Sequence, residues 1–349
     1  MPINDFINRL TNKFTDTIFF KEDSELELQI EALKKIKEKY SDNYLISQKL
    51  LLAELGYKGE KEIEFELKNA NIGMYVLRDV NIEYQDLKAQ IDYLVITPAK
   101  KYFIECKNLV GNITIDNKGN FVREYQYGKR KIKEGLYSPI NQAQRHIEIY
   151  KKIWKERNTG LLDKTIRLKH FNEFNVPLVV LANSKNVLDD RYAPKDVKKY
   201  VIRSDRLVDY LKKDLEAANK DSLWNKKDMY DFCYSFMINY NKMVNRDYEK
   251  ELEEWVQNNS KVSNLVEKNE ENQTDNTSKV LEIRKKLISF RTSRAKEKNI
   301  PPYYVFNNDE LDKILIMMPK TKQELANARI LTEVKLKLHG EEIVRVINE

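Results

Sequence analysis

The segment Gln90 to Leu109, with the sequence QIDYLVITPAKKYFIECKNL, constrains the fold most strongly. It contains two apolar, strand-forming runs on either side of Pro98, and a tight turn there would pair them as antiparallel strands. In such a pair, residues whose numbers have the same sum lie opposite each other, so Asp92 faces Glu105. Because side chains alternate along a strand, Lys107 shares the face of Glu105. The pattern therefore predicts three charged side chains on one face of an otherwise apolar hairpin.

Two carboxylates placed opposite each other repel and would destabilise the hairpin. A divalent cation between Asp92 and Glu105 removes this objection, and Lys107 adds a second positive charge. Mg²⁺ is usually held by one or two carboxylates together with water and substrate phosphate. A cation that activates water, beside a lysine that binds phosphate, suits phosphodiester hydrolysis. We therefore expect a nuclease-type site that uses Mg²⁺, with Mn²⁺ as an alternative.

The alternative interpretation is an exposed strand face on which the three charges only contact solvent. The spacing D-x₁₂-E-x-K is loose and does not by itself decide between the two. The flanking apolar sequences ITP and YFI favour the site, because charges on a buried pair of strands need partners.

Glu60 is a candidate for a further carboxylate at the same site and a further metal ligand. It precedes Ile63 and Leu67 by three and seven residues, so it lies on their inward-facing side of a helix. It is equally compatible with a place at the edge of that apolar stripe, or with the preference of acidic residues for a first helical turn, here after Gly59.

A helix is predicted to start at Ser138, because a serine followed by proline is typical of an N-terminus. Helix N-termini bind anions, so Gln142 is expected to contact phosphate or the attacking water. His146 lies one turn later and is interpreted as a surface or packing residue rather than a ligand.

Basic side chains with aromatic neighbours are candidates for nucleic-acid contacts, since this combination suits a groove that follows a phosphate backbone. A solvated loop explains the basic residues near Tyr125 and Tyr127 equally well. The residues that this pattern offers are Lys129, Arg130 and Lys131, and Arg145 is added because it lies beside Gln142 and His146 on the predicted helix.

The charge balance is only mildly basic, with 62 Lys and Arg against 55 Asp and Glu among 349 residues. A net charge of +7 permits a nucleic-acid partner without requiring one. No signal peptide is visible and no stretch reaches the roughly 20 apolar residues of a membrane span. We therefore expect a cytoplasmic protein without a membrane partner, and its two cysteines are too far apart in sequence to suggest a zinc site.

The pattern of elements predicts an α/β layer fold, because helical and strand periodicities alternate along the chain. Helices are predicted at 23–40, 47–68 and 138–155, and strands at 74–81, on both sides of Pro98, at 176–181 and at 200–202. The Gly- and Lys-rich stretch after Leu109 predicts no element. A segment rich in Asn, Ser, Glu and Lys indicates a flexible linker, because it cannot bury enough apolar surface to offset its ordering entropy. The expected divisions are an N-terminal helical extension at 1–49, a main domain at 50–255 with its motifs at about 50–160, a linker at 256–279 and a small all-α domain at 280–349.

Four separated blocks between about Leu50 and Ile153 resemble the nuclease-related domain (NERD). These blocks are GYKGEKEIEFEL, QIDYLVI, YFIECKNLVGNI and SPINQAQRH. The family is regarded as a divergent branch of the PD-(D/E)xK nucleases, so the resemblance implies a restriction-endonuclease-like core with Asp92, Glu105 and Lys107 as its site. By the same resemblance, Glu60 is the helix carboxylate and Gln142 the auxiliary polar residue. The chain departs from the common Pro-Asp pair, because Ile91 precedes Asp92.

The segment 280–349 resembles the HRDC domain, named for helicases and RNase D, over nearly its whole length. The resemblance rests on the R-x₂-R-A helix at Arg291 to Ala295, the turn Ile300 to Tyr303 and the motif Pro319 to Thr321. It implies nucleic-acid binding in which Arg291 and Arg294 contact the ligand, with DNA expected over RNA, and a protein partner as a second role. The chain departs from the family where it reads Ala328 to Leu331, because the family commonly has a glycine-containing turn there, near its DNA-contacting surface.

Three classes of function remain open from the sequence. The first is a metal-dependent nuclease or DNA-processing protein that hydrolyses phosphodiester bonds, with the HRDC domain as an accessory nucleic-acid-binding module. The second is a non-catalytic nucleic-acid-binding or adaptor protein that retains the nuclease fold. The third is a protein-interaction scaffold. The presence of all three residues Asp92, Glu105 and Lys107 favours the first.

Overall fold

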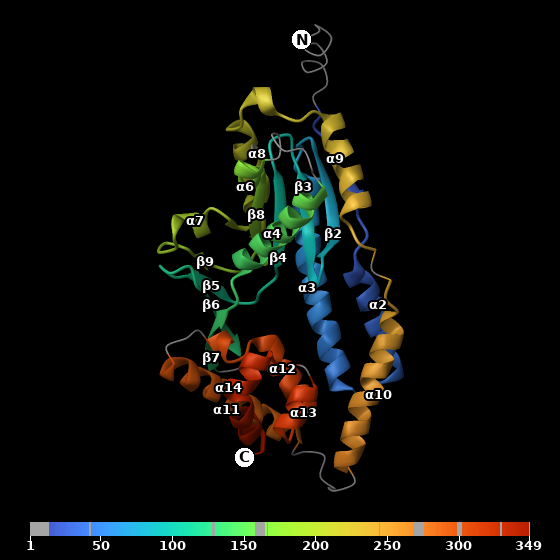
Figure 1. The fold of residues 1–349 in the computed structure, drawn as a ribbon, viewed down its shortest axis with the longest axis vertical. Helices are drawn as coiled ribbons and strands as arrows, with labels where there is room; N and C mark the ends of the chain where they lie inside the picture. The colour runs from blue at the N-terminus through green and yellow to red at the C-terminus, as the bar shows by residue number, and fades with distance from the viewer. Residues whose placement is uncertain are drawn as a thin grey trace. The chain divides into compact units, whose positions relative to one another are not determined.

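The computed structural model describes residues 14–41, 43–127, 130–157, 165, 167–243, 245–267, 276–298, 302–328 and 330–348. The chain divides into two compact units, Met1–Glu249 and Lys250–Glu349. The first is a mixed α/β unit and the second is helical, as the sequence predicts (Figure 1).

A six-stranded mixed sheet forms the centre of the first unit, in the order β1-β2-β3-β4-β8-β10. Its middle strands β2, β3 and β4 are antiparallel, whereas β1, β8 and β10 pair in parallel with their neighbours. The strands are β1 (Thr17–Lys21), β2 (Met74–Tyr84), β3 (Leu87–Ile96), β4 (Lys101–Lys107), β8 (Asn175–Leu181) and β10 (Val201–Arg203).

Helices cover both faces of this sheet, because strand side chains alternate and the central strands are apolar on both sides. On one face, Leu94 and Phe103 pack with Ile147 and Tyr150 of α4 and with Phe236 of α9. The helices on this side are α4 (Pro139–Arg157), α6 (Phe171–Phe174) and α9 (Lys226–Asn239).

The opposite face packs against α3 and α8. Tyr93 and Ile104 lie in one apolar cluster with Ile63 of α3 and Leu211 of α8. The helices are α3 (Tyr44–Lys68) and α8 (Leu207–Glu216), and α2 (Glu25–Lys39) lies against α3. The site-bearing hairpin β3–β4 is thus in the middle of a three-layer α/β/α arrangement.

The N-terminal segment is not only a helical extension. β1 adds to the edge of the sheet, pairing Thr17 with Met74 and Ile18 with Tyr75. α2 then starts after the N-cap Ser24, whose Oγ accepts a hydrogen bond from the amide of Leu26. The expected boundary at residue 49 also falls inside α3. Five strand residues carry too short a pattern to be separated from a loop by sequence alone, and pairing with β2 decides their conformation.

A second, four-stranded sheet follows the hairpin, in the order β7-β6-β5-β9, where the sequence predicted no element. Its strands β6 and β7 are polar, and cross-strand ion pairs join Arg123 to Glu134 and Lys131 to Glu124. Such pairs stabilise strands without the apolar alternation used for prediction. The strands are β5 (Asn112–Ile115), β6 (Phe121–Tyr127), β7 (Arg130–Leu136) and β9 (Leu188–Asp189), with the short helix α7 (Lys195–Lys198) after them.

The second unit has one apolar core, built around the side chains of Leu287, Phe306, Leu311 and Ile343. Its helices begin at polar caps, as at Asn307, which forms a capping box with Glu310. The helices are α10 (Tyr248–Glu267), α11 (Asn276–Glu297), α12 (Asn308–Met317), α13 (Lys322–Asn327) and α14 (Glu333–Asn348).

The segment 256–279 differs from the flexible linker that its composition predicted. α10 continues to Glu267 and α11 begins at Asn276, so residues on both sides of 268–275 are helical. Residues 268–275 lie outside the described residues. Leu252, Trp255 and Val256 recur at helical spacing just before this segment, and Val256 is buried, so the helix starts from an apolar stripe and extends into the polar sequence.

We expect Phe103→Ala to lower the free energy of unfolding of the first unit by about 3–5 kcal/mol, because its side chain is fully buried between β4 and α4. Phe174→Ala is the matched control, since that ring is 44% exposed and its loss should change stability much less. Urea denaturation followed by tryptophan fluorescence measures both. Equal losses for the two variants would contradict this account of the core.

Candidate functional site

The hairpin has the register that the sequence predicts. Tyr93 pairs with Ile104 and Ile96 with Lys101, so paired residue numbers have the same sum as Asp92 and Glu105. The turn is closed by Thr97, whose amide donates to the carbonyl of Lys100 at 2.9 Å. Beyond the last backbone pair, the carboxylate of Asp92 accepts a hydrogen bond from the amide of Cys106 at 2.7 Å. Asp92 therefore continues the connection between the two strands with its side chain.

Glu105 is buried, with only 3% of its surface exposed. One carboxylate oxygen, Oε1, accepts a hydrogen bond from Lys107 Nζ at 2.5 Å. The other, Oε2, is also buried and has no hydrogen-bond partner among the described residues. An unpartnered buried carboxylate oxygen is costly unless a cation or donor completes it.

Burial makes the carboxyl groups of Asp92 and Glu105 weaker acids than they are in water. The pKa of Asp92 is raised well above its ordinary value, first by burial and then by repulsion from Glu105 and Glu60. Burial also raises the pKa of Glu105, although Lys107 and Arg145 oppose the increase. For Lys107, burial opposes the charged form, but attraction to Glu105 outweighs it and the pKa is raised. The site thus holds more negative charge than its one lysine compensates.

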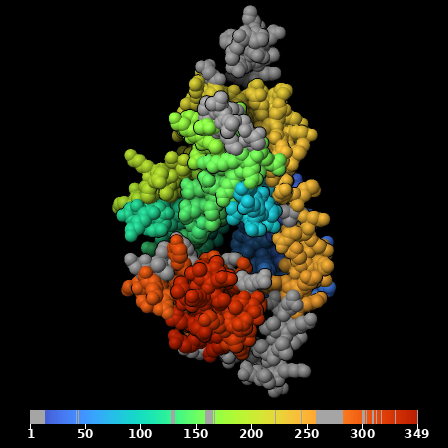
Figure 2. Space-filling model, viewed as in Figure 1, coloured from blue at the N-terminus to red at the C-terminus, as the bar shows by residue number. Residues whose placement is uncertain are grey.

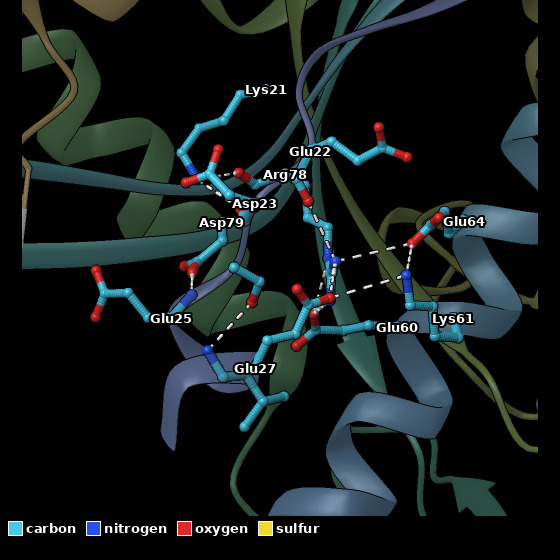
Figure 3. A network of polar contacts seen from close by, with 12 residues as sticks. Lys21, Glu22, Asp23, Glu25, Glu27, Glu60, Lys61, Glu64, Arg78 and Asp79 are labelled. Atoms are coloured by element: carbon cyan, nitrogen blue, oxygen red, sulfur yellow. Dashed lines mark hydrogen bonds and ion pairs between the residues drawn. The ribbon is translucent and has the colours of Figure 1, made fainter. Parts of the chain in front are cut away.

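Glu60 is placed differently from the expectation. Its Oε2 accepts hydrogen bonds from Nη2 and Nε of Arg78, at 2.9 and 3.2 Å, instead of joining Asp92 and Glu105 (Figure 3). Arg78 on β2 is completely buried and also binds Glu27 of α2 at 2.7 Å. Burial raises the pKa of Glu60 more than Arg78 lowers it, so this carboxylate is held but poorly solvated.

Two signals of this arrangement are visible in the sequence. An arginine and an aspartate interrupt the apolar strand MYVLRDV, and a buried arginine requires acidic partners. Asp79 has a positive φ of 51° and accepts a hydrogen bond from Gln90 Nε2 at 2.7 Å and another from the amide of Glu25. The N-terminal segment is therefore fastened to the sheet beside the site (Figure 3).

α3 comes close to the end of β4 because residue 59 is a glycine. A Cβ added there would lie 2.5 Å from Cβ of Asn108 and 3.3 Å from that of Ala182. Asn108 in turn donates a hydrogen bond from Nδ2 to the carbonyl of Leu55 at 2.6 Å. These contacts set the place of Glu60, the next residue on the helix.

α4 supplies the opposite wall of the site. The helix follows Ser138 as predicted, and Gln142 accepts a hydrogen bond from Lys107 Nζ at 3.2 Å. His146, one turn later, is buried and not a surface residue, and its Nδ1 lies 4.0 Å from Glu105 Oε2. Burial, with Arg145 and Lys107 nearby, lowers the pKa of His146 to about 4, so the ring is neutral at neutral pH.

A pocket of about 490 Å³ opens between α4 and the start of β3. Figure 2 shows the cyan surface of the β2–β3 turn region beside the green surface of α4, where the pocket lies. Its lining residues are Leu87, Lys88, Ala89, Gln90, Asp92, Gln142, Arg145, His146 and Ile149. Asp92, Gln142 and His146 thus line one pocket.

The basic residues expected to contact nucleic acid are distributed over several elements. Lys131 is paired with Glu124 on the β6–β7 hairpin, and Arg145 lies over the ring of Tyr137. Lys129 falls outside the described residues, and Arg130 begins β7.

In the second unit, Arg291 donates to the carbonyl of Phe306 at 3.3 Å, and Arg294 is bound to Glu297 and Glu342. Both arginines of the R-x₂-R-A motif therefore stabilise their own unit. Their expected contact with nucleic acid stays a prediction.

The residues present fit a divalent cation at two carboxylates rather than three. Among the described residues, no group of three or more His, Cys, Asp or Glu side chains is arranged to hold a metal ion. Asp92 and Glu105 nevertheless form a repelling pair with one unpartnered oxygen, which a hard cation would complete. Glu60, the third expected ligand, is bound to Arg78.

The chain contains two known domains. Residues 55–182 match the nuclease-related domain (NERD) family and cover α3, the site hairpin, α4 and β8. Residues 280–347 match the HRDC domain family. The protein is therefore nuclease-related in its first unit and carries an HRDC domain in its second. Among curated proteins and among solved structures, none matches this chain. No helix within the described ranges is long and apolar enough to cross a membrane.

We expect Asp92→Asn to stabilise the metal-free protein at neutral pH by about 1–3 kcal/mol, since it removes an uncompensated buried charge. A carboxyl whose folded pKa is raised favours folding when protonated, and this contribution is lost as the pH rises above the ordinary value of 3.8. The gain should therefore shrink as the pH falls toward 3.8. Urea denaturation in EDTA across this pH range measures it.

Asp189→Asn is the control, because hydrogen bonds from Arg191 lower the pKa of Asp189 to about 2 and its charge is compensated. No gain is expected there. A destabilised Asp92→Asn protein at neutral pH would show that the Asp92 charge is already balanced in the folded chain.

We expect Arg78→Met to destabilise the first unit by about 3–5 kcal/mol, since it leaves Glu60 and Glu27 beside an apolar side chain. Adding Glu60→Gln should recover part of this loss, because the two residues interact directly. A double-mutant cycle in urea measures the coupling. Strictly additive effects would mean that the ion pair contributes nothing.

Proposed function

We propose that this protein is a metal-dependent nuclease that hydrolyses phosphodiester bonds in DNA at Asp92, Glu105 and Lys107. The observation that carries the proposal is the buried, mutually repelling pair Asp92 and Glu105, with one unpartnered oxygen and a lysine 2.5 Å from the other. A buried carboxylate oxygen without a hydrogen-bond partner is costly, and a cation held together with the second carboxylate, that of Asp92, would complete it. The match of this segment to a nuclease-related family supports the same function.

Each residue has a distinct part in the proposed reaction. Asp92 and Glu105 would hold Mg²⁺, or Mn²⁺ in its place, together with solvent and a phosphate oxygen. The cation supplies positive charge that makes water a better nucleophile and neutralises the phosphate. Lys107 favours the ionised form of Glu105 through its hydrogen bond, against the effect of burial, and would present its charge to the phosphate, where negative charge develops. Gln142 restrains Lys107 from the side of α4.

The arrangement of elements supports a restriction-endonuclease-like core. The site hairpin β3–β4 is followed by α4 and then by β8, which returns parallel to β4. The first carboxylate therefore lies on a middle strand, and the second on the strand where antiparallel pairing changes to parallel. The HRDC domain would act as an accessory module for nucleic acid, held on the same chain so that its local concentration is high.

The test is cleavage of linear, circular and single-stranded DNA, and of RNA, with Mg²⁺, Mn²⁺ or EDTA. Asp92→Asn, Glu105→Gln and Lys107→Met should each lower turnover by about 10²–10³-fold or more, since each removes charge from the reacting centre. Glu60→Gln should cost less, because its carboxylate is bound to Arg78. Glu124→Gln, which removes a partly exposed strand carboxylate, is the matched control.

Cleavage that persists in EDTA or in Glu105→Gln would contradict the metal mechanism. Salt-dependent DNA binding without cleavage, in the presence of either metal, would support a non-catalytic adaptor that retains the fold.

A further inference from the structure

Two polar residues on one face of α4 have nearly the same spacing as two polar residues on one face of β4. Glu105 and Lys107 are two residues apart on one strand face, a spacing of about 6.6 Å. Gln142 and His146 are one turn apart on one helix face, a spacing of about 6 Å along the axis. Lys107 contacts Gln142. Because α4 and β4 run in opposite directions here, His146 then lies next to Glu105.

Lys107 forms a hydrogen bond with its partner on α4, whereas Glu105 does not reach its partner. Lys107 Nζ reaches Gln142 Oε1 at 3.2 Å, a hydrogen bond. Glu105 Oε2 lies 4.0 Å from His146 Nδ1, beyond hydrogen-bond length, and has no other partner among the described residues. Both side chains are buried, at 3% and 8% exposure, so an acceptor and a ring nitrogen face each other in a place that water hardly reaches.

We propose that His146 is a positioning residue for Glu105: its Nδ1–H donates a hydrogen bond to Oε2 and fixes the orientation in which this carboxylate holds a cation. The inference rests on the proposed function, because it assigns a role toward the same site. A closing movement of about one ångström, from 4.0 Å to an ordinary hydrogen-bond length, completes the contact. Hydrogen-bonded partners of this kind orient carboxylate ligands and strengthen metal binding.

The surroundings favour a donor over a packing ring. A neutral imidazole has one N–H and one lone pair, and the hydrogen bond at one nitrogen decides where the proton lies. A lone pair on Nδ1 would face the carboxylate oxygen and be repelled, whereas an N–H there is attracted. An apolar side chain in this position would leave Oε2 buried without any donor. His146 is therefore chemically specific and not interchangeable with the isoleucines beside it on α4.

The first test is the tautomer of His146 in the metal-free full-length protein. A long-range ¹H–¹⁵N correlation spectrum separates the Nδ1–H and Nε2–H forms, and the chain has three histidines, so His170→Asn and His339→Asn assign the signals. The proposal expects the Nδ1–H form for His146. An Nε2–H form would overturn it, whatever the protein does to DNA.

The second test compares Mn²⁺ affinity, read from the electron paramagnetic resonance signal of free Mn²⁺. His146→Leu should weaken binding by about 10–100-fold. Asparagine has nearly the same shape as leucine but places an N–H donor near the position of Nδ1. His146→Asn should therefore retain most of the affinity that His146→Leu loses. His170→Leu is the matched control, since His170 is exposed and bound to Glu173 on another element.

The outcomes separate the two proposals. If wild-type protein binds Mn²⁺ and loses it in Glu105→Gln, while His146→Leu and His146→Asn bind equally, the positioning role is wrong and the proposed nuclease site stands. If the wild type and Glu105→Gln bind Mn²⁺ equally, the proposed metal site itself is wrong, and the positioning role with it. Should His146→Leu fail to fold, the tautomer of the wild-type protein still decides.

Discussion

Charge buried in the central sheet is the constraint on which the rest of the first unit depends. Arg78 on β2 and Glu105 on β4 are among the most deeply buried charged groups, and neither can remain inside without partners. Arg78 is fully compensated by Glu60 and Glu27, which belong to two different helices. Glu105 is compensated at one oxygen only. The free-energy cost of burying a charge thus holds two helices to the sheet at Arg78, and leaves Glu105 with an oxygen that can bind a cation or a donor.

The compensated cluster, formed by Arg78 with Glu60 and Glu27, explains why the N-terminal segment belongs to the first unit. α2 contributes Glu27 to Arg78 and its first amide, that of Glu25, to Asp79, while β1 extends the sheet next to β2. These contacts bind the segment before residue 55 to the part that matches the nuclease-related family. The cluster also restrains Glu60, whose negative charge contributes to the raised pKa of Asp92. Fastening the N-terminal segment therefore also sets the electrostatics of the proposed site.

α4 lies over the pair Asp92 and Glu105, and the spacing of its polar residues is close to that of the polar residues on β4. Gln142 holds the lysine, His146 faces the carboxylate, and Arg145 favours its ionised form. Because these groups are carried by a helix and a strand that pack together, only a small movement is needed to assemble the site, which lowers its cost. The pocket between α4 and the start of β3 then gives Asp92 access to solvent.

Local features of the chain could be predicted from its residues alone. Alternation and a tight turn at Pro98 gave the register of β3 and β4, and hence the proximity of Asp92, Glu105 and Lys107, because strand geometry has a period of two. The helix start at Ser138 followed from the residues Ser138 and Pro139, and the helical character of the second unit followed from its periodicity. Features that depend on partners distant in sequence became visible only in the folded chain. Arg78 binds one carboxylate oxygen of Glu60, the third expected ligand, and α4 brings His146 to within 4.0 Å of Glu105. β1 and the polar second sheet formed through cross-strand pairing. These outcomes are set by which buried charges meet, and a buried charge takes its partner from whichever element the fold brings near.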